Sequence, residues 1–85
     1  MKRLIIIITP FTLKQTLMTV ENGTVIGSES FLLKDLNDIV FSKKDIEKII
    51  FFGSKDYVQK FIDQLKKKEL EEYQYNKITY EIKEP

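Results

Sequence analysis

The sequence predicts a single small α/β domain, residues 1–85, built around one five-stranded mixed sheet. Three observations predict this class. The first part of the chain holds three strand-like segments with a turn signal between two of them, and the second part alternates helical with strand-like spacing. No linker rich in Pro, Gly or Ser divides the chain. A chain of this length has room for one hydrophobic core.

The first three strands form an antiparallel meander. Residues 4–8 are an unbroken apolar run that ends at Thr9-Pro10, which indicates a central strand with apolar side chains on both faces. Strands are expected next over residues 12–20 and 24–31, because Asn22-Gly23 between them is the strongest short hairpin signal. The third strand carries mostly polar residues, so we expect it at an edge of the sheet.

A helix is predicted over residues 32–40, where apolar residues recur at helical spacing behind Ser30, a candidate N-cap. Ser42 and Asp45 are then expected to cap one more turn. Residues 48–52 repeat the two-sided apolar character of the first strand. Two such strands joined through a helix predict adjacent parallel strands that are covered on both faces.

The second helix is expected from Lys55 onwards, where one apolar stripe runs to Leu65. The last strand is predicted from the alternation of Ile78, Tyr80 and Ile82 with polar residues. Right-handed crossovers then give the spatial strand order 3-2-1-4-5, with strands one, four and five parallel.

This strand order resembles the ribonuclease H-like fold, which includes the actin-like ATPase domains and acetate-kinase-type chains. Residues 5–10 (IIIITP) and 20–26 (VENGTVI) resemble the opening strand and hairpin of the acetate-kinase-type chains. The resemblance implies a catalytic carboxylate on the first strand and another at the end of the fourth in nucleases, or a Gly-containing phosphate turn after the first strand in kinases. In this sequence the first strand, residues 4–8, contains no acid, and the fourth strand ends at Phe52-Gly53 without one. The segment after the first strand is Thr9-Pro10-Phe11-Thr12, which contains no Gly. The resemblance therefore implies a non-catalytic relative.

Composition excludes several classes of function. The chain contains no Cys, His or Trp, which removes disulfides, thiol nucleophiles, Cys/His zinc sites and His-dependent catalysis. The formal net charge is +1 and Arg3 is the only Arg, so nucleic acid is an improbable partner. The apolar run at residues 4–8 is too short for a secretory signal or a membrane span, so we expect a cytoplasmic protein with no membrane partner. No metal or cofactor is expected.

The most site-like stretch is Gly53-Ser54-Lys55, which leads from a central strand into a helix N-terminus. Backbone amides at a helix start attract anions, and Thr9 and Thr12 are expected at the same end of the parallel strands. The sequence therefore predicts an anion-binding rim. The simpler alternative is that Gly53 makes a tight turn and Ser54 caps the helix.

Tyr73, Tyr75 and Tyr80 are candidates for a partner-binding surface, because tyrosine combines a large apolar ring with a polar tip. The alternative is that they seal the small core. The leading hypothesis is a non-catalytic protein-interaction module that acts through edge strands or self-association as a homodimer.

The size and codon-biased composition suit an accessory protein of a phage or mobile element. The alternative function is weak nucleotide or nucleic-acid binding at the rim of Thr9 and residues 53–55. A third hypothesis is a hydrolase that uses Asp35, Asp38, Asp45 and Glu47, but these acids have no second acid cluster to converge with.

Overall fold

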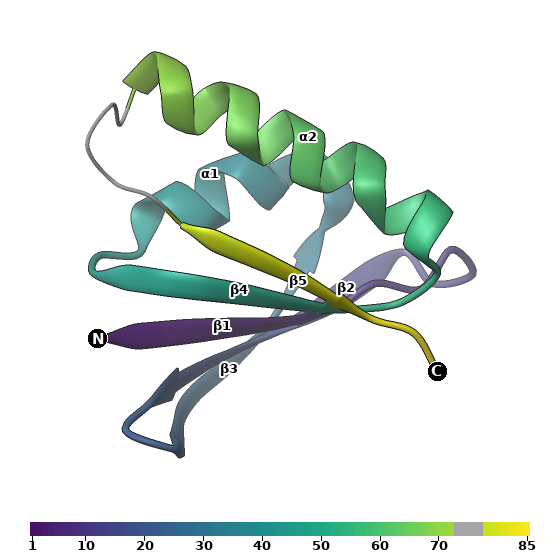
Figure 1. The fold of residues 1–85 in the computed structure, drawn as a ribbon. Helices are drawn as coiled ribbons and strands as arrows, with labels where there is room; N and C mark the ends of the chain where they lie inside the picture. Colours follow the sequence, from purple (N-terminus) through teal and green to yellow (C-terminus); the bar gives the residue numbers. More distant parts are fainter. Residues whose placement is uncertain (73–77) are drawn as a thin grey trace.

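A computed structural model describes residues 1–72 and 78–85 of the chain, without the side chain of Glu72 (Figure 1). Within these ranges it contains five strands, two α-helices and one short 3-10 helix. In chain order they are β1 (Lys2–Ile7), β2 (Lys14–Glu21), β3 (Thr24–Leu32), η1 (Leu33–Asp35), α1 (Leu36–Ser42), β4 (Ile46–Phe52), α2 (Lys55–Glu72) and β5 (Thr79–Lys83).

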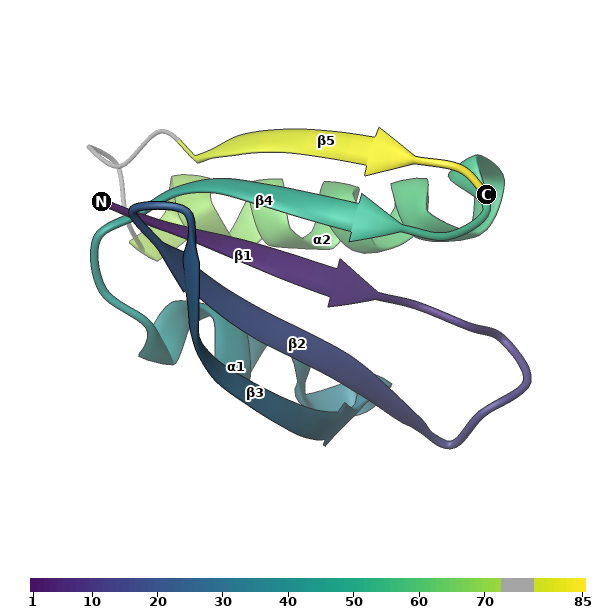
Figure 2. The same cartoon turned by 90° about the horizontal axis from the view of Figure 1, so that it is seen from below.

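The five strands form one mixed sheet in the order β3-β2-β1-β4-β5 (Figure 2). β1 pairs antiparallel with β2 and parallel with β4, and β4 pairs parallel with β5. The predicted small α/β class and the predicted strand order are therefore confirmed. The mostly polar β3 lies at an edge of the sheet, as its composition predicts, and β5 forms the other edge.

The hairpin between β2 and β3 turns at Asn22 and Gly23. Both residues have positive φ, 52° and 78°, which is the backbone of a type I′ turn. Asn and Gly tolerate this left-handed region better than other residues because of their short or absent side chains. The hairpin signal in the sequence is thus confirmed at both of its central positions.

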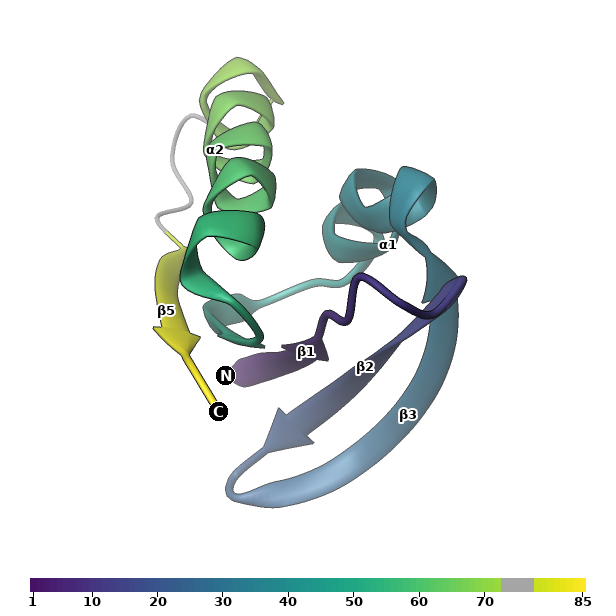
Figure 3. The same ribbon diagram turned by 90° about the vertical axis from the view of Figure 1, so that its right-hand side faces the viewer.

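Both described helices lie on the same face of the sheet (Figures 1 and 3). The residues that fill the space between sheet and helices are almost completely shielded from solvent: Leu4, Ile6, Leu17, Ile49 and Phe51 from the strands, and Leu36, Val40, Val58, Ile62 and Leu65 from the helices. The core is therefore a single layer of apolar side chains between one sheet and two helices.

The expectation that the central strands are covered on both faces is wrong. No described element covers the second face of the sheet. The reason lies in the topology: β3, β4 and β5 are parallel and follow one another in the same direction across the sheet. Two right-handed crossovers made in the same direction place their helices on the same face.

The first helix also differs from its prediction. Ser30 lies inside β3 rather than at a helix N-cap, and the chain passes through η1 before α1 begins at Leu36. At the other end, the Ser42 hydroxyl donates a 2.6 Å hydrogen bond to the carbonyl of Ile39, and α1 ends there. Asp45 caps no further turn, because its φ of 61° leads the backbone directly into β4. The Ser42 hydroxyl and the amide of Lys43 thus provide donors for the carbonyls of Ile39 and Val40 at this end.

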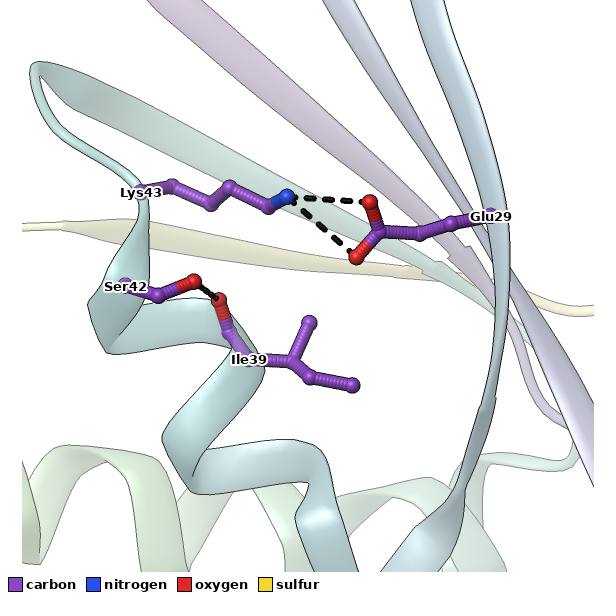
Figure 4. A network of polar contacts seen from close by, with 4 residues as sticks. All are labelled: Glu29, Ile39, Ser42 and Lys43. Atoms are coloured by element: carbon purple, nitrogen blue, oxygen red, sulfur yellow. Dashed lines mark hydrogen bonds and ion pairs between the residues drawn. The ribbon is translucent and has the colours of Figure 1, made fainter.

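An ion pair connects the end of α1 to the sheet edge (Figure 4). Lys43 Nζ lies 3.1 Å and 3.2 Å from the two carboxylate oxygens of Glu29 on β3. Exposed pairs of this kind contribute little stability. The contact links the residue after α1 to the β3 edge.

Candidate functional site

The predicted rim lies at the carboxyl ends of β1 and β4, which are neighbours in the sheet. The amide of Ile8 donates a 2.9 Å hydrogen bond to the carbonyl of Phe52, so the chain segments that follow the two strands begin side by side. A Cβ built on Gly53 would lie 2.8 Å from the Ile8 carbonyl oxygen and 3.0 Å from a methyl group of Val58. Glycine at position 53 thus permits a close approach between β1 and the start of α2.

Two backbone amides at the start of α2 already have partners. The amide of Gly53 donates to the carbonyl of Lys83 at 3.2 Å, and the amide of Lys55 donates to a carboxylate oxygen of Glu84 at 3.3 Å. The first turn of α2 does attract an anion, as helix N-termini do, but the anion is a side chain of the same protein. The backbone carbonyl of Ser54 accepts the first hydrogen bond of α2, from the amide of Val58 at 2.8 Å.

Thr9 and Thr12 belong to a separate network around Gln15. The Gln15 side chain is buried, and it accepts from the Thr9 amide at 2.7 Å. Its amide group donates to the Thr9 carbonyl at 3.1 Å and to the Thr12 carbonyl at 3.0 Å. The hydroxyls of Thr9 and Thr12 bond to each other. This network closes the loop between β1 and β2.

Sequence reasoning missed Gln15. The alternation of strand side chains could have indicated that Gln15 is buried. Gln15 and Leu17 occupy alternate positions and point to the same, buried side of β2. A buried amide side chain must find hydrogen-bond partners, and the backbone of the adjoining loop provides them.

The places where ribonuclease H-like nucleases would hold acids are apolar. Ile7 at the end of β1 pairs with Phe52 at the end of β4. Among the residues that the structure describes, no three acidic side chains gather closely enough to hold a metal ion. Asp35 and Asp38 lie at the start of the α1 region, whereas Asp45 and Glu47 lie around the start of β4.

Of the three candidate tyrosines, Tyr73 and Tyr75 lie outside the described residues. Tyr80 lies on β5 with its ring against the core under α2. Its hydroxyl donates a 3.1 Å hydrogen bond to Glu69, a side chain only 8% exposed. Burial, followed by the charge and hydrogen bond of Glu69, raises the pKa of Tyr80 well above its usual range. This placement favours the alternative that Tyr80 seals the core over the one that it binds a partner.

The second face of the sheet carries a group of neighbouring apolar side chains outside the core. We call it the open face and define it by Ile5, Ile7, Met18, Ile50 and Phe52. These side chains alternate along their strands with fully buried ones, so they point away from the helices. Ile7 is 37% and Phe52 39% exposed, and the other three are partly exposed.

The strand register places the apolar side chains of the open face next to one another. Met18 pairs with Ile5, and Ile5 pairs with Ile50, so three apolar side chains form one row across β2, β1 and β4. Ile7 and Phe52 form part of the next row. The result is an apolar centre on the three inner strands.

Polar residues border this centre at both ends of the Ile5 row, whereas Val20 and Val25 extend the apolar surface towards the hairpin. On the β3 side, Ser28 continues the Met18 row, and on the β5 side, Glu81 continues the Ile50 row. Lys48 Nζ lies 2.6 Å from the Glu81 carboxylate, and this hydrogen bond lowers the pKa of Glu81. At the hairpin end, Arg3 Nε lies 3.0 Å from the carboxylate of Glu47.

Comparison with models of protein families, with curated proteins and with solved structures gives no match for this chain. Among the described helices, none combines the length and apolar character needed to cross a membrane.

A second exposed apolar element is the loop between β1 and β2. Phe11 is 95% and Leu13 82% exposed, and the loop projects beyond the end of the sheet (Figure 2). Sequence reasoning considered Phe11 only as part of the segment that stands where a kinase would have its phosphate turn. The Gln15 network therefore holds in place a loop that presents two apolar side chains to solvent.

Proposed function

We propose that this chain is a non-catalytic protein-interaction module that docks through the open face of its sheet. The observation that carries the proposal is the one-sided placement of α1 and α2, which leaves Ile5, Ile50 and Phe52 without a covering layer. A contiguous exposed apolar patch with a polar border is typical of an interaction site in a small domain.

The physical argument is the cost of hydrating the open face. Burial of apolar surface contributes about 25 cal/mol for each Å² removed from water. A small domain that leaves a row of Met18, Ile5 and Ile50 partly exposed forgoes that stabilisation in isolation. A partner layer on the open face would supply it.

The strand order is the one that the ribonuclease H-like resemblance implies, and the apolar pair of Ile7 and Phe52 stands where that family's acids would converge. Both points support a relative of that family that has its sheet but lacks its catalytic acids. A small cytoplasmic accessory protein of a phage or mobile element is the setting we propose for it.

Edge strands provide a second route of association in the same proposal. β3 contains neither Lys, Arg nor Pro, which are residues that commonly protect an edge from pairing. A partner strand that pairs with β3 would extend the sheet without covering the open face.

A matched pair of charge variants tests the use of the open face. Phe52→Lys places a charge within the apolar centre, whereas Gln64→Lys places the same charge on the exposed side of α2, away from the open face. Each variant and the wild type would be immobilised and exposed to extract from the native host. We expect Phe52→Lys to lose bound protein and Gln64→Lys to keep it, with circular dichroism showing that both are folded. Equal retention by all three proteins would contradict the proposal.

A further inference from the structure

We infer that the occupant of the open face is a second copy of this chain, packed face to face about a two-fold axis that passes close to Ile5. This inference rests on the proposed function and names the partner.

The position of Ile5 suits a two-fold axis. β1 is the middle strand of five, and Ile5 lies in the middle row of the open face between Met18 and Ile50. A two-fold axis makes the same patch serve both partners, so the patch must have its apolar centre near the axis and its polar residues towards the rim. The open face has this arrangement, with Ser28 and Glu81 at the two ends of the Ile5 row.

The area is sufficient for a weak pair. The strands are 5 to 9 residues long, and five strands with about 4.8 Å between neighbours span about 20 Å. A copy that covers a sheet of this outline would bury on the order of 500 Å² on each partner, towards the lower end of the range for protein–protein interfaces. Two twisted sheets pack in this way with about 10 Å between them and a crossing angle of about 30°.

The charges favour a second copy over a strongly charged partner. Arg3 pairs with Glu47, and Lys48 pairs with Glu81, so two of the positive charges beside the apolar centre are compensated within each copy, while Lys83 beside Phe52 adds one positive charge at the rim. The formal net charge of +1 adds little repulsion between two copies. An apolar, weakly charged face is complementary to another face of the same kind.

The chain lacks cysteine, so an introduced thiol is unique and reports a single position. In the proposed pair, the two copies of residue 5 face each other across the axis between sheets about 10 Å apart, which is too far for a disulfide but within reach of a short thiol-to-thiol crosslinker. We therefore expect Ile5→Cys to form a covalent dimer with a bismaleimide that spans about 10 Å, faster than two controls. Gln64→Cys places the thiol on the exposed side of α2, and Ser28→Cys places it on the β3 edge.

Sedimentation equilibrium of the purified protein from micromolar to millimolar concentration provides the second measurement. We expect the wild-type mass to rise from 10.1 kDa towards twice that value, and Ile5→Lys to weaken the association at least tenfold. Ile5→Thr serves as a milder variant should Ile5→Lys fail to fold, and its association should weaken in the same direction.

The outcomes separate this inference from the proposed function. A wild-type monomer at millimolar concentration, with no preferential linkage through Ile5→Cys, overturns the second copy. Face-dependent capture of a foreign protein would still support the open face as a docking site. Preferential linkage through Ser28→Cys would instead show pairing along β3 and overturn the face-to-face arrangement. Linkage at residue 5 with a concentration-dependent mass supports it.

Discussion

The hydroxyl of Tyr80 donates a 3.1 Å hydrogen bond to Oε2 of Glu69, across the gap between β5 and α2. The other carboxylate oxygen accepts a 2.7 Å bond from the amide of Ile78. One buried carboxylate thus fixes the start of the last strand to the last turns of α2. Loss of an acceptor that leaves buried donors unpaired costs about 1–3 kcal/mol. We expect Glu69→Ala to lower the free energy of unfolding by this amount in urea denaturation.

A matched control for that substitution lies two residues further along the same helix. Glu71 is exposed, so Glu71→Ala should change the free energy of unfolding by less than about 0.5 kcal/mol. Equal effects of the two substitutions would show that Glu69 contributes only helix propensity.

The raised pKa of Tyr80 predicts a loss of stability at high pH. The phenol of an unfolded chain ionises near pH 10. In the folded protein, burial and Glu69 keep the Tyr80 phenol protonated at that pH. Below pH 10 both states hold the proton and stability is unaffected; above pH 10 only the unfolded state releases it, so the free energy of unfolding falls.

Urea denaturation between pH 8 and pH 11.5 measures this effect. Tyr80→Phe removes the phenol, so its stability should fall less steeply above pH 10 than that of the wild type. Parallel pH profiles of the two proteins would contradict a raised pKa of Tyr80 in the fold.

Gly53 tests the close approach of β1 and α2. Gly53→Ala should lower the free energy of unfolding by about 1–3 kcal/mol, because its Cβ would lie 2.8 Å from the Ile8 carbonyl oxygen. Gly27→Ala is the control, since a Cβ at that position meets no atom within 4 Å. A small effect of Gly53→Ala, equal to that of Gly27→Ala, would show that the two backbones separate easily.

Gln15 tests whether the loop between β1 and β2 is held in place. Gln15→Leu keeps the volume but leaves the Thr9 amide and the Thr9 and Thr12 carbonyls without their partner. We expect a loss of about 1–3 kcal/mol in the free energy of unfolding, with faster hydrogen exchange at Thr9. Gln64→Leu is the control on an exposed position of α2. Unchanged exchange at Thr9 would contradict the network.

Glu84 tests the predicted anion rim. Because its carboxylate occupies the Lys55 amide, we expect inorganic phosphate at millimolar concentration to leave the amide resonances of residues 53–56 unmoved in the wild type. Glu84→Gln should shift the Lys55 resonance and speed its hydrogen exchange, whereas Glu71→Gln should do neither. Saturable, salt-sensitive shifts of these amide resonances with phosphate in the wild type would support nucleotide or nucleic-acid binding at the rim.

The sequence was sufficient for the elements whose signals are local. Asn22-Gly23 predicts its turn because few other residues adopt positive φ at two successive positions. The alternation of Ile78, Tyr80 and Ile82 predicts the buried side of β5 because strand side chains alternate. The strand order followed from these elements and the right-handed crossover rule.

Features that depend on distant partners were not predictable in the same way. Ile5 and Ile50 have the composition of doubly covered strands, and only the direction of both crossovers shows that one face is left open. The carboxylate that accepts a hydrogen bond from the Lys55 amide belongs to Glu84, which is 29 residues further along the chain. Single-sequence patterns report which residues are apolar or charged but not which segment meets them.

The central position of β1 also affects how the chain folds during synthesis. The ribosome makes β1 before β4, and residues 8–45 separate the two strands. At about 5–20 residues per second, β1 waits on the order of seconds for its parallel neighbour. During this interval the meander of β1, β2 and β3 can form, but the β4 side of an isoleucine-rich strand stays unpaired. The nascent chain is therefore most susceptible to aggregation, and most in need of a chaperone, before Phe52 has emerged.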